Sequence, residues 1–142
     1  MLNKELILKK IEQIGTLISE LKELLKDDVA DFIRNIKIVR SAERNFQLMV
    51  DTAIDINGKI ILERSKKIPD SYRQSFLELE TLEIFSHELA SSLAPTASLR
   101  NILVHEYDFE EDYNKFYEAA KASIPVYEEY CKAIHRFIEK NI

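Results

Sequence analysis

Residues 29–62 read VADFIRNIKIVRSAERNFQLMVDTAIDINGKIIL. Apolar side chains recur along this stretch at three- and four-residue intervals, the spacing of one helix face. They are Phe32, Ile33, Ile36, Val39, Phe46, Met49, Val50, Ala53 and Ile54. The polar face between them comprises Arg40, Glu43, Arg44 and Asp51. The pattern predicts one long amphipathic helix from residue 29 to about residue 62, preceded by a break at Asp27 and Asp28 that offers an N-cap.

The rest of the chain continues this helical spacing on both sides. The expected elements are a helix over about residues 3–26, a loop at 65–69, a helical segment from 72 to about 93 that is either one irregular helix or two short ones, a helix over about 96–106, and a last helix over about 110–140. Asp70 or Ser71 could cap the segment that begins at Tyr72. Pro95 and Thr96 indicate a helix start, and Pro125 predicts a kink.

The composition leaves little room for β-hairpins, because the chain contains only 2 glycines and 3 prolines. With 142 residues it is long enough to bury a core of its own. We therefore expect an all-α fold, an antiparallel bundle of four or five helices, formed as a single domain over residues 1–142.

The cysteine count and the charge exclude several classes of protein. A single cysteine, Cys131, excludes an intramolecular disulfide framework and a cysteine-based zinc site. The N-terminus lacks the pattern of a signal peptide and no stretch is apolar enough to span a bilayer, so we expect a cytoplasmic protein. The formal net charge of −5 disfavours non-specific binding to nucleic acid. Any RNA site must therefore be a local basic patch on an acidic body.

Residues 100–107 read RNILVHEY and carry the side chains best suited to chemistry. On a helix, Leu99, Ile102 and Leu103 share one face and suit the core. The opposite half holds Arg100, Asn101, Val104, His105 and Tyr107. A guanidinium, an amide, an imidazole and a phenol thus share one surface.

These groups suit the cleavage of a phosphodiester in RNA. Imidazole titrates near neutral pH, so His105 could accept the proton of the attacking 2′-hydroxyl. Arg100 could stabilise the charge of the phosphorane, and Asn101 could orient either the imidazole or the phosphate. The scheme needs no metal. The competing interpretation is a solvated helix face without a function.

The signature of an arginine, a polar residue, three residues, a histidine, one residue and a tyrosine resembles that of the HepT-like branch of the HEPN superfamily. The resemblance extends upstream to residues 40–47 (RSAERNFQ) and 51–56 (DTAIDI) and, by helix order, over nearly the whole chain. It implies a helical bundle that dimerises through the signature region, so that two copies of Arg100 and His105 line one cleft. It also implies metal-independent RNA cleavage with no cofactor. The implied role is a toxin paired with a small nucleotidyltransferase antitoxin, which transfers AMP to Tyr107.

Two other functions remain open at this point. The domain could be a non-catalytic module that holds a nucleotide or substrate for a separate nucleotidyltransferase, or a purely structural dimerisation bundle. The signature favours the enzyme, because a passive module would not need both Arg100 and His105.

Other polar and aromatic residues fit plainer roles. His87 fits a surface or interhelical position and His135 a solvated face, and the three histidines lack the spacing of metal ligands. Asp51 and Asp55 could hold a metal, although capping, solvation or interhelical pairing suits them better. Arg40 and Arg44 fit an ion-pair network on the helix surface, or alternatively the border of an RNA groove. An aromatic stripe, Tyr113, Phe116, Tyr117, Tyr127 and Tyr130, predicts core or dimer contacts.

Overall fold

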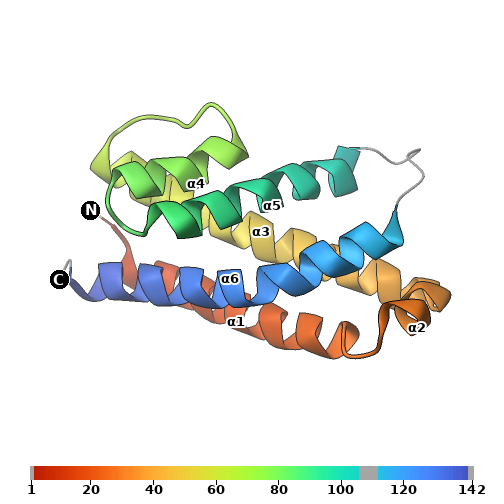
Figure 1. Ribbon diagram of the computed structural model, residues 1–142. Coiled ribbons are helices and arrows are strands. Elements are labelled where there is room, and N and C mark those ends of the chain that lie inside the picture. Colours follow the sequence, from red (N-terminus) through yellow and green to blue (C-terminus); the bar gives the residue numbers. More distant parts are fainter. Residues whose placement is uncertain (1, 106–111, 141–142) are drawn as a thin grey trace.

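The computed structural model describes residues 2–105 and 112–140, and within them it contains six α-helices and no strand. The helices are α1 (Lys4–Leu24), α2 (Val29–Arg34), α3 (Ile36–Arg64), α4 (Tyr72–Thr81), α5 (His87–His105) and α6 (Tyr113–Lys140). Figure 1 shows them as a bundle. The all-α class expected from the sequence is confirmed. No helix in these ranges is long and apolar enough to cross a membrane.

The helices α1, α2 and α4 each begin at a side-chain cap. The side-chain oxygens of Asn3, Asp28 and Ser71 accept hydrogen bonds from the backbone N–H groups three residues later, at 3.1, 2.9 and 3.1 Å respectively. Of the candidates in the sequence, Asp28 rather than Asp27 caps α2, and Ser71 rather than Asp70 caps α4. Each of these bonds satisfies an N–H group that the first helical turn would otherwise leave without a partner.

The helix expected over residues 29–62 is divided at Asn35, which corrects the prediction of one continuous helix. Asn35 has an extended backbone (φ −111°, ψ 93°), and it ends α2 and begins α3. Its Oδ1 accepts a hydrogen bond from Ile38 N at 3.3 Å, an alternative to continuing the helix that asparagine readily provides. The apolar spacing does not reveal this break, because Phe32 on one side and Val39 on the other are both buried.

Pro95 lies inside α5, which corrects the prediction that a helix begins at Pro95 and Thr96. The α5 helix instead follows Ser86, whose hydroxyl accepts a hydrogen bond from Leu89 N at 3.1 Å. Proline removes only the bond to the carbonyl of Ser91, and Ser91 is exposed, so water can satisfy that carbonyl. Packing of the flanking turns against the core keeps the helix continuous.

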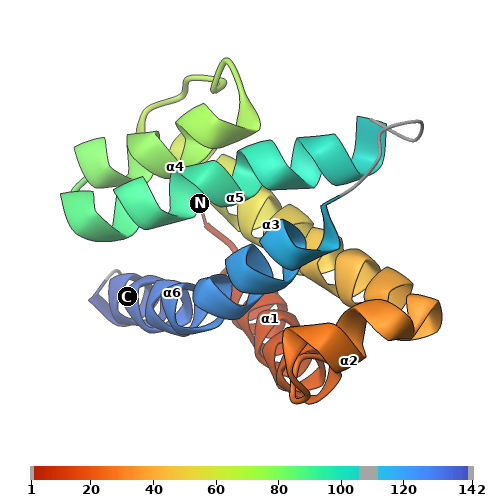
Figure 2. The same cartoon turned by 45° about the vertical axis from the view of Figure 1, so that its right-hand side comes forward.

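The long α3 helix lies at the centre and packs against α1, α2, α4 and α5, while α6 packs against α1, α2 and α5. Figures 1 and 2 show α6 bending partway along its length, as expected for a helix that contains proline. Four of the five residues of the predicted aromatic stripe lie in the core, since Phe116, Tyr117, Tyr127 and Tyr130 are buried, whereas Tyr113 is only partly buried.

A buried polar network fixes the start of α4 against α3. Tyr130 OH donates to Asn57 Oδ1 at 2.7 Å, and Asn57 Nδ2 donates to Ser75 Oγ at 3.1 Å. Ser75 Oγ in turn donates to the carbonyl of Tyr72 at 2.7 Å. Burial raises the pKa of Tyr130 well above its usual value, so its hydroxyl remains a donor. The network holds the first turn of α4 in a defined place beside α5.

Candidate active site

The helices α4 and α5 are antiparallel neighbours, and this arrangement places the signature beside the start of α4. Glu80 near the end of α4 contacts His87 at the start of α5. Tyr72 at the start of α4 contacts Arg100 near the end of α5. The signature residues therefore lie beside α3 and the N-terminal turn of α4.

Arg100 is held between two neighbouring helices. Its Nε donates to Asp51 Oδ1 of α3 at 2.5 Å, and its guanidinium carbon lies 5.1 Å from the centre of the Tyr72 ring. Only 13% of its side chain is exposed. A carboxylate and an aromatic face together restrict the guanidinium. Arg100 is therefore a fixed cation rather than a mobile surface arginine.

Asn101 contacts the arginine of the signature. Its Oδ1 accepts a hydrogen bond from Arg100 Nη1 at 3.2 Å. The amide therefore helps to orient the guanidinium, a partner different from the imidazole or phosphate considered from the sequence. Nη2 of Arg100 has no acceptor among the described residues, so it can still donate to a ligand.

His105 is the last residue of α5 and is exposed. Together with Asn101 it lines a pocket of about 550 Å³ between α3, α5 and the beginning of α4. The described residues supply no hydrogen-bond partner to its ring. The sequence therefore correctly placed His105 and Asn101 on a common surface. Tyr107, the fourth residue singled out, lies outside the described residues.

Ile102 does not lie in the core as expected, because it is 39% exposed. The buried stripe of α5 runs through Leu89, Leu93 and Ala97, and helical spacing continues it to the half-buried Arg100. Extending that stripe along the sequence would have indicated that Arg100 faces inward and that Ile102 does not.

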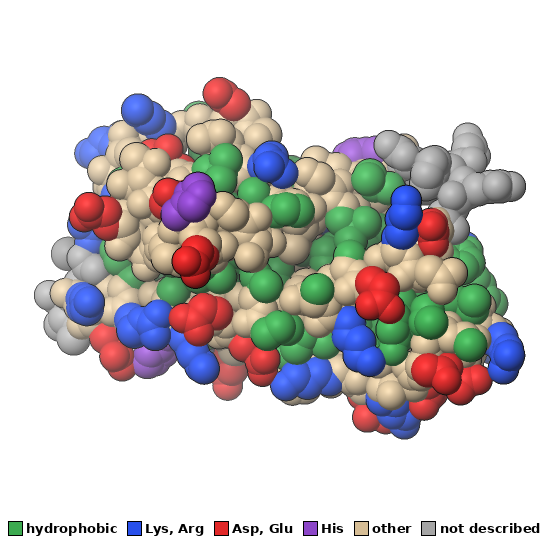
Figure 3. Space-filling model, in the orientation of Figure 1, with side chains coloured by type: hydrophobic (Ala, Val, Ile, Leu, Met, Phe, Trp, Pro, Cys, Tyr) green, Lys and Arg blue, Asp and Glu red, His purple; other side chains and the backbone are tan. Residues whose placement is uncertain are grey.

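Ile102 instead borders an apolar groove between α5 and α6. The groove has a volume of about 720 Å³, and its lining includes Pro95, Leu99, Ile102, Ala122 and Val126. Figure 3 shows hydrophobic side chains collected between these two helices. One side of the terminal turns of α5 thus carries the polar signature, and another side carries an exposed apolar surface.

The two aspartates of α3 are each engaged by a cation. Asp51 pairs with Arg100, and Asp55 pairs with Lys10 at 2.7 Å and with Lys59 at 3.3 Å. Burial acts to raise the pKa of Asp55, but hydrogen bonds from the two lysines outweigh it and lower that pKa. Interhelical pairing, one of the three roles that the sequence favoured over metal binding, occurs at both aspartates. Within residues 2–105 and 112–140, no group of three or more His, Cys, Asp or Glu side chains could hold a metal ion.

The surface interpretation of Arg40 and His135 also holds in the structure. Arg40 Nη1 pairs with Glu43 at 2.8 Å, and its Nη2 donates to the hydroxyl of Tyr113 at 3.2 Å. His135 is half exposed and lies 3.5 Å from Glu139 on the same helix. Arg44 is exposed.

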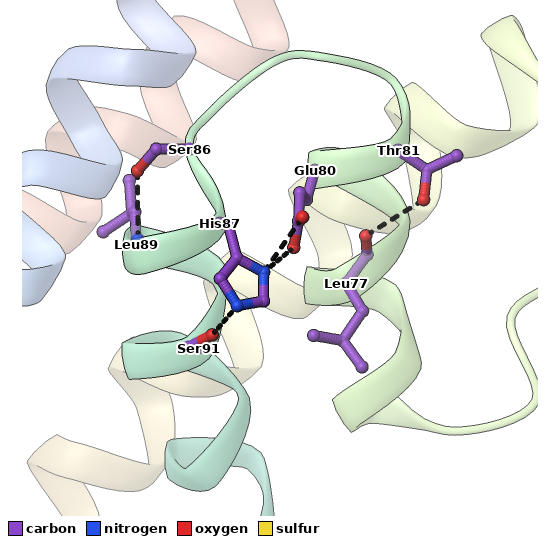
Figure 4. A network of polar contacts seen from close by, with 7 residues as sticks. All are labelled: Leu77, Glu80, Thr81, Ser86, His87, Leu89 and Ser91. Carbon is purple, nitrogen blue, oxygen red and sulfur yellow. Dashed lines mark hydrogen bonds and ion pairs between the residues drawn. The ribbon is translucent and has the colours of Figure 1, made fainter.

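His87 forms a second polar cluster at the opposite end of α5 (Figure 4). Its Nδ1 lies 3.1 and 3.0 Å from the two carboxylate oxygens of Glu80, and its Nε2 lies 3.3 Å from Ser91 Oγ. The order of carboxylate, imidazole and hydroxyl is that of a hydrolase triad. The His87 side chain is nevertheless 78% exposed, and none of the three residues borders the pocket or groove described above. The cluster matches the interhelical role expected for His87.

Known proteins resemble this chain in sequence and in structure. The family model "Ribonuclease HepT-like" matches residues 14–134. The tRNA nuclease HepT of Aphanizomenon flos-aquae is 31% identical over 129 residues, which cover 91% of this chain and 87% of that protein. The mRNA nuclease HepT of Shewanella oneidensis is 29% identical over 103 residues, which cover 72% and 77% respectively.

A solved structure shows the same fold. The tri-AMPylated HEPN toxin of Shewanella oneidensis in complex with an MNT antitoxin superimposes with a TM-score of 0.84. It is 25% identical, and the match covers 96% of this chain and 99% of that one. The family model, the curated relatives and this superposition agree with the resemblance seen in residues 100–107. This chain therefore belongs to the ribonuclease HepT-like family of HEPN-type ribonucleases.

Proposed function

We propose that this protein is the endoribonuclease toxin of a toxin–antitoxin pair and that it cleaves RNA without a metal ion. The observation that carries the proposal is the fixed, half-buried Arg100, five residues before a histidine that borders an open pocket. A structural arginine would use its donors inside the protein. Arg100 keeps Nη2 without an acceptor among the described residues, beside the surface that holds His105.

Arg100 would stabilise the phosphate during the reaction. The phosphorane formed at phosphorus carries more negative charge than the diester, and a guanidinium already held in place stabilises it without reorganising. Asp51 accepts from Nε and Asn101 accepts from Nη1, and these two contacts fix the plane of the guanidinium. The direction of the other N–H groups of Arg100 is therefore fixed as well. The arrangement suits recognition of a phosphate by a planar group.

His105 would move the protons. Its imidazole takes the proton of the 2′-hydroxyl, whose oxygen forms the new bond to phosphorus. The bond from phosphorus to the 5′-oxygen breaks, and that oxygen leaves as a hydroxyl after receiving a proton from an imidazolium. The products are a 2′,3′-cyclic phosphate and a 5′-hydroxyl. The exposed position of His105 at the end of α5 leaves its ring accessible to RNA.

A second copy of the chain would complete the cleft. Ile102, which borders the apolar groove between α5 and α6, lies on the same helix as Arg100 and His105. A two-fold partner seated in this groove would therefore bring two signatures together. Two copies of Arg100 would then form the local basic patch that a chain with a net charge of −5 needs to hold RNA. Arg44 is exposed on α3 and could extend this patch.

Control by an antitoxin is the remaining part of the proposal. Relatives include a toxin that is tri-AMPylated and bound to an MNT antitoxin. By the resemblance of the signature, Tyr107 would receive AMP from a small nucleotidyltransferase partner, and the added phosphate would compete with RNA for Arg100. The expected place of action is the cytoplasm, where such a partner and the RNA are present.

Cleavage of RNA by the purified protein in excess EDTA tests the mechanism. We expect cleavage to persist and the products to end in a 2′,3′-cyclic phosphate. Arg100→Ala should abolish it, whereas Arg34→Ala, which removes an exposed arginine that pairs with Asp31 on the same short helix, should not. Loss of activity in EDTA that a divalent ion restores would refute the mechanism. Nucleotide binding without any cleavage would favour the non-catalytic module.

A further inference from the structure

The pocket beside His105 has a character different from that of the arginine site next to it. Its volume is about 550 Å³, and it lies between the middle of α3, the segment before α4 and the last turns of α5. Apolar walls come from Ile54, Ile68 and Pro69. Asn101 and His105, two residues of the signature, form the side of the pocket on α5. The pocket is therefore continuous with the surface on which the phosphate would lie.

The charge of the pocket argues against a second phosphate as its occupant. No lysine or arginine is among the described residues that line it, whereas Asp70 contributes an exposed carboxylate. An anion in this pocket would be repelled by the Asp70 carboxylate, and no lysine or arginine among the described lining residues would offset its desolvation. An uncharged planar ring suits the apolar walls, and a carboxylate can accept hydrogen bonds from its N–H groups.

Tyr72 connects the pocket to Arg100. Its ring contacts the guanidinium of Arg100 at 5.1 Å, and the same residue lines the pocket with 46% of its surface exposed. A nucleotide whose phosphate contacts Arg100 would therefore have its base next to Tyr72. Aromatic side chains stack on bases of any sequence, with a contribution of about 1–3 kcal/mol per base.

Asn101 supplies the polar contact that could distinguish one base from another. Its Oδ1 accepts from Arg100, which orients the amide and leaves Nδ2 as a donor with no acceptor among the described residues. A base that offers an acceptor to this donor binds better than one that does not, because a base that covers the exposed amide without pairing with it removes its water.

We propose that this pocket binds the nucleobase next to the scissile phosphodiester and thereby determines the sequence preference of cleavage. The proposal rests on the proposed ribonuclease function, and it assigns a role to residues outside the signature. Pro69, Asp70 and Tyr72 lie more than 25 residues from Arg100 in the sequence and reach the site only through the packing of α4 on α5.

Gly58 provides a direct probe of the pocket. It lies inside α3 and lines the pocket, and a Cβ built there meets no atom within 4 Å. A leucine at this position would extend into open space and would also favour the helix, because glycine is a poor helix former. Gly15 in α1 is a matched control: it is also helical, has no atom within 4 Å of a built Cβ, and is not among the residues that line the pocket.

The experiment compares wild type, Gly58→Leu and Gly15→Leu on RNA oligonucleotides that differ only in the base on either side of the cleavage site. We expect wild type to prefer certain bases at one of these positions. Gly58→Leu should lose about 10-fold or more in kcat/KM on the preferred base, the size of effect that filling a pocket produces, and so flatten the preference. Gly15→Leu should behave as wild type.

A binding measurement separates this proposal from the proposed function. Titration with the four nucleoside 3′-monophosphates, followed by NMR, reports on the pocket without any cleavage. Weaker binding to Gly58→Leu than to Gly15→Leu would support the pocket even for a chain that cleaves no RNA. Ile68→Asp is a second variant; because 87% of Ile68 is exposed, it changes the pocket wall with little effect on the fold. If wild type cleaves RNA but both pocket variants keep its base preference and nucleotide binding, the base pocket is refuted and the nuclease function stands.

Discussion

The two ends of α5 each carry a histidine, and the two histidines have opposite surroundings. His87 at the start has hydrogen-bond partners at both ring nitrogens, Glu80 and Ser91. His105 at the end has no such partner among the described residues, but it borders a pocket of about 550 Å³ and follows Arg100 on the same helix. The better connected imidazole is thus not the one that borders a pocket and follows an arginine on the same helix.

The difference shows that a chain of hydrogen bonds from carboxylate to imidazole to hydroxyl, as at His87, is by itself a poor indicator of a catalytic site. A reaction needs space for the substrate and a group that stabilises the charge formed in the transition state. The His105 end offers both, through the pocket and through Arg100.

The largest expected effect is the difference in RNA cleavage between two variants, one without His105 and one without His87. His105→Ala should lower RNA cleavage by about 1000-fold or more, since general acid–base catalysis commonly supplies about 100-fold to 10,000-fold. His87→Ala should leave the rate within about 2-fold of wild type, because surface changes away from the site rarely matter. Steady-state cleavage of one labelled oligonucleotide measures both. Equal losses in the two variants would remove the distinction between the ends of α5.

A smaller effect is expected from Asp51→Asn, which keeps the shape of the side chain but removes its charge. Arg100 would lose its ionic anchor on α3, and misplacement of a catalytic group by about 1 Å can cost about 100-fold in rate. We expect kcat to fall by about 10-fold to 100-fold. KM should not rise, because the site becomes less negative.

Asp55→Asn is the matched control for this prediction. Asp55 lies one turn further along α3 and pairs with Lys10 and Lys59 rather than with Arg100. Its loss should leave kcat unchanged. A purely structural role of Asp51 would instead change the unfolding temperature of the variant without lowering kcat at a temperature where it is folded.

The groove on the other side of α5 gives a third prediction. Ile102→Glu places a charge in the apolar surface proposed to bind a second copy. We expect light scattering at micromolar concentration to show a dimer for wild type and a monomer for this variant, with RNA cleavage reduced by about 10-fold or more, since a charge in the core of an interface costs several kcal/mol. Leu62→Glu is the control, because Leu62 is 62% exposed at the far end of α3. A monomeric wild type would refute the composite cleft.

The all-α class and the part of the candidate site that lies on one helix could be predicted from the sequence, because both depend on residues only a few positions apart. Arg100, Asn101 and His105 lie within six consecutive residues, so one helix suffices to bring them to one surface. Asp51 and Tyr72 could not be assigned in this way. Asp51 lies 49 residues before Arg100, and only the packing of α3 and α4 on α5 brings both to the guanidinium.

The two misplaced helix boundaries have a common cause. Asn35 interrupts a stretch whose apolar spacing continues without a break, and Pro95 sits in a helix that its own side chain disfavours. In both places a local preference competes with burial of the neighbouring turns. A side-chain hydrogen bond wins at Asn35, and packing wins at Pro95. Spacing rules cannot weigh these contributions, because the outcome depends on the partner helices.

The smallest effect should separate the two ends of α5 by stability rather than by activity. The Glu80–His87 contact is a surface pair with side chains 34% and 78% exposed, whereas the Asp51–Arg100 pair has side chains 33% and 13% exposed. Exposed ion pairs contribute about 0.2–1 kcal/mol, and hydrogen bonds to charged groups that are removed from water contribute about 1.5–3 kcal/mol. Double-mutant cycles with alanine, followed by urea unfolding, should therefore give a coupling below about 0.5 kcal/mol for Glu80 and His87. The coupling between Asp51 and Arg100 should exceed about 1 kcal/mol and should be less sensitive to added salt. A stronger coupling at the His87 end would mean that the Glu80–His87–Ser91 cluster is held more rigidly than its exposure indicates, and the ranking of the two ends would then rest on the pocket and Arg100 alone.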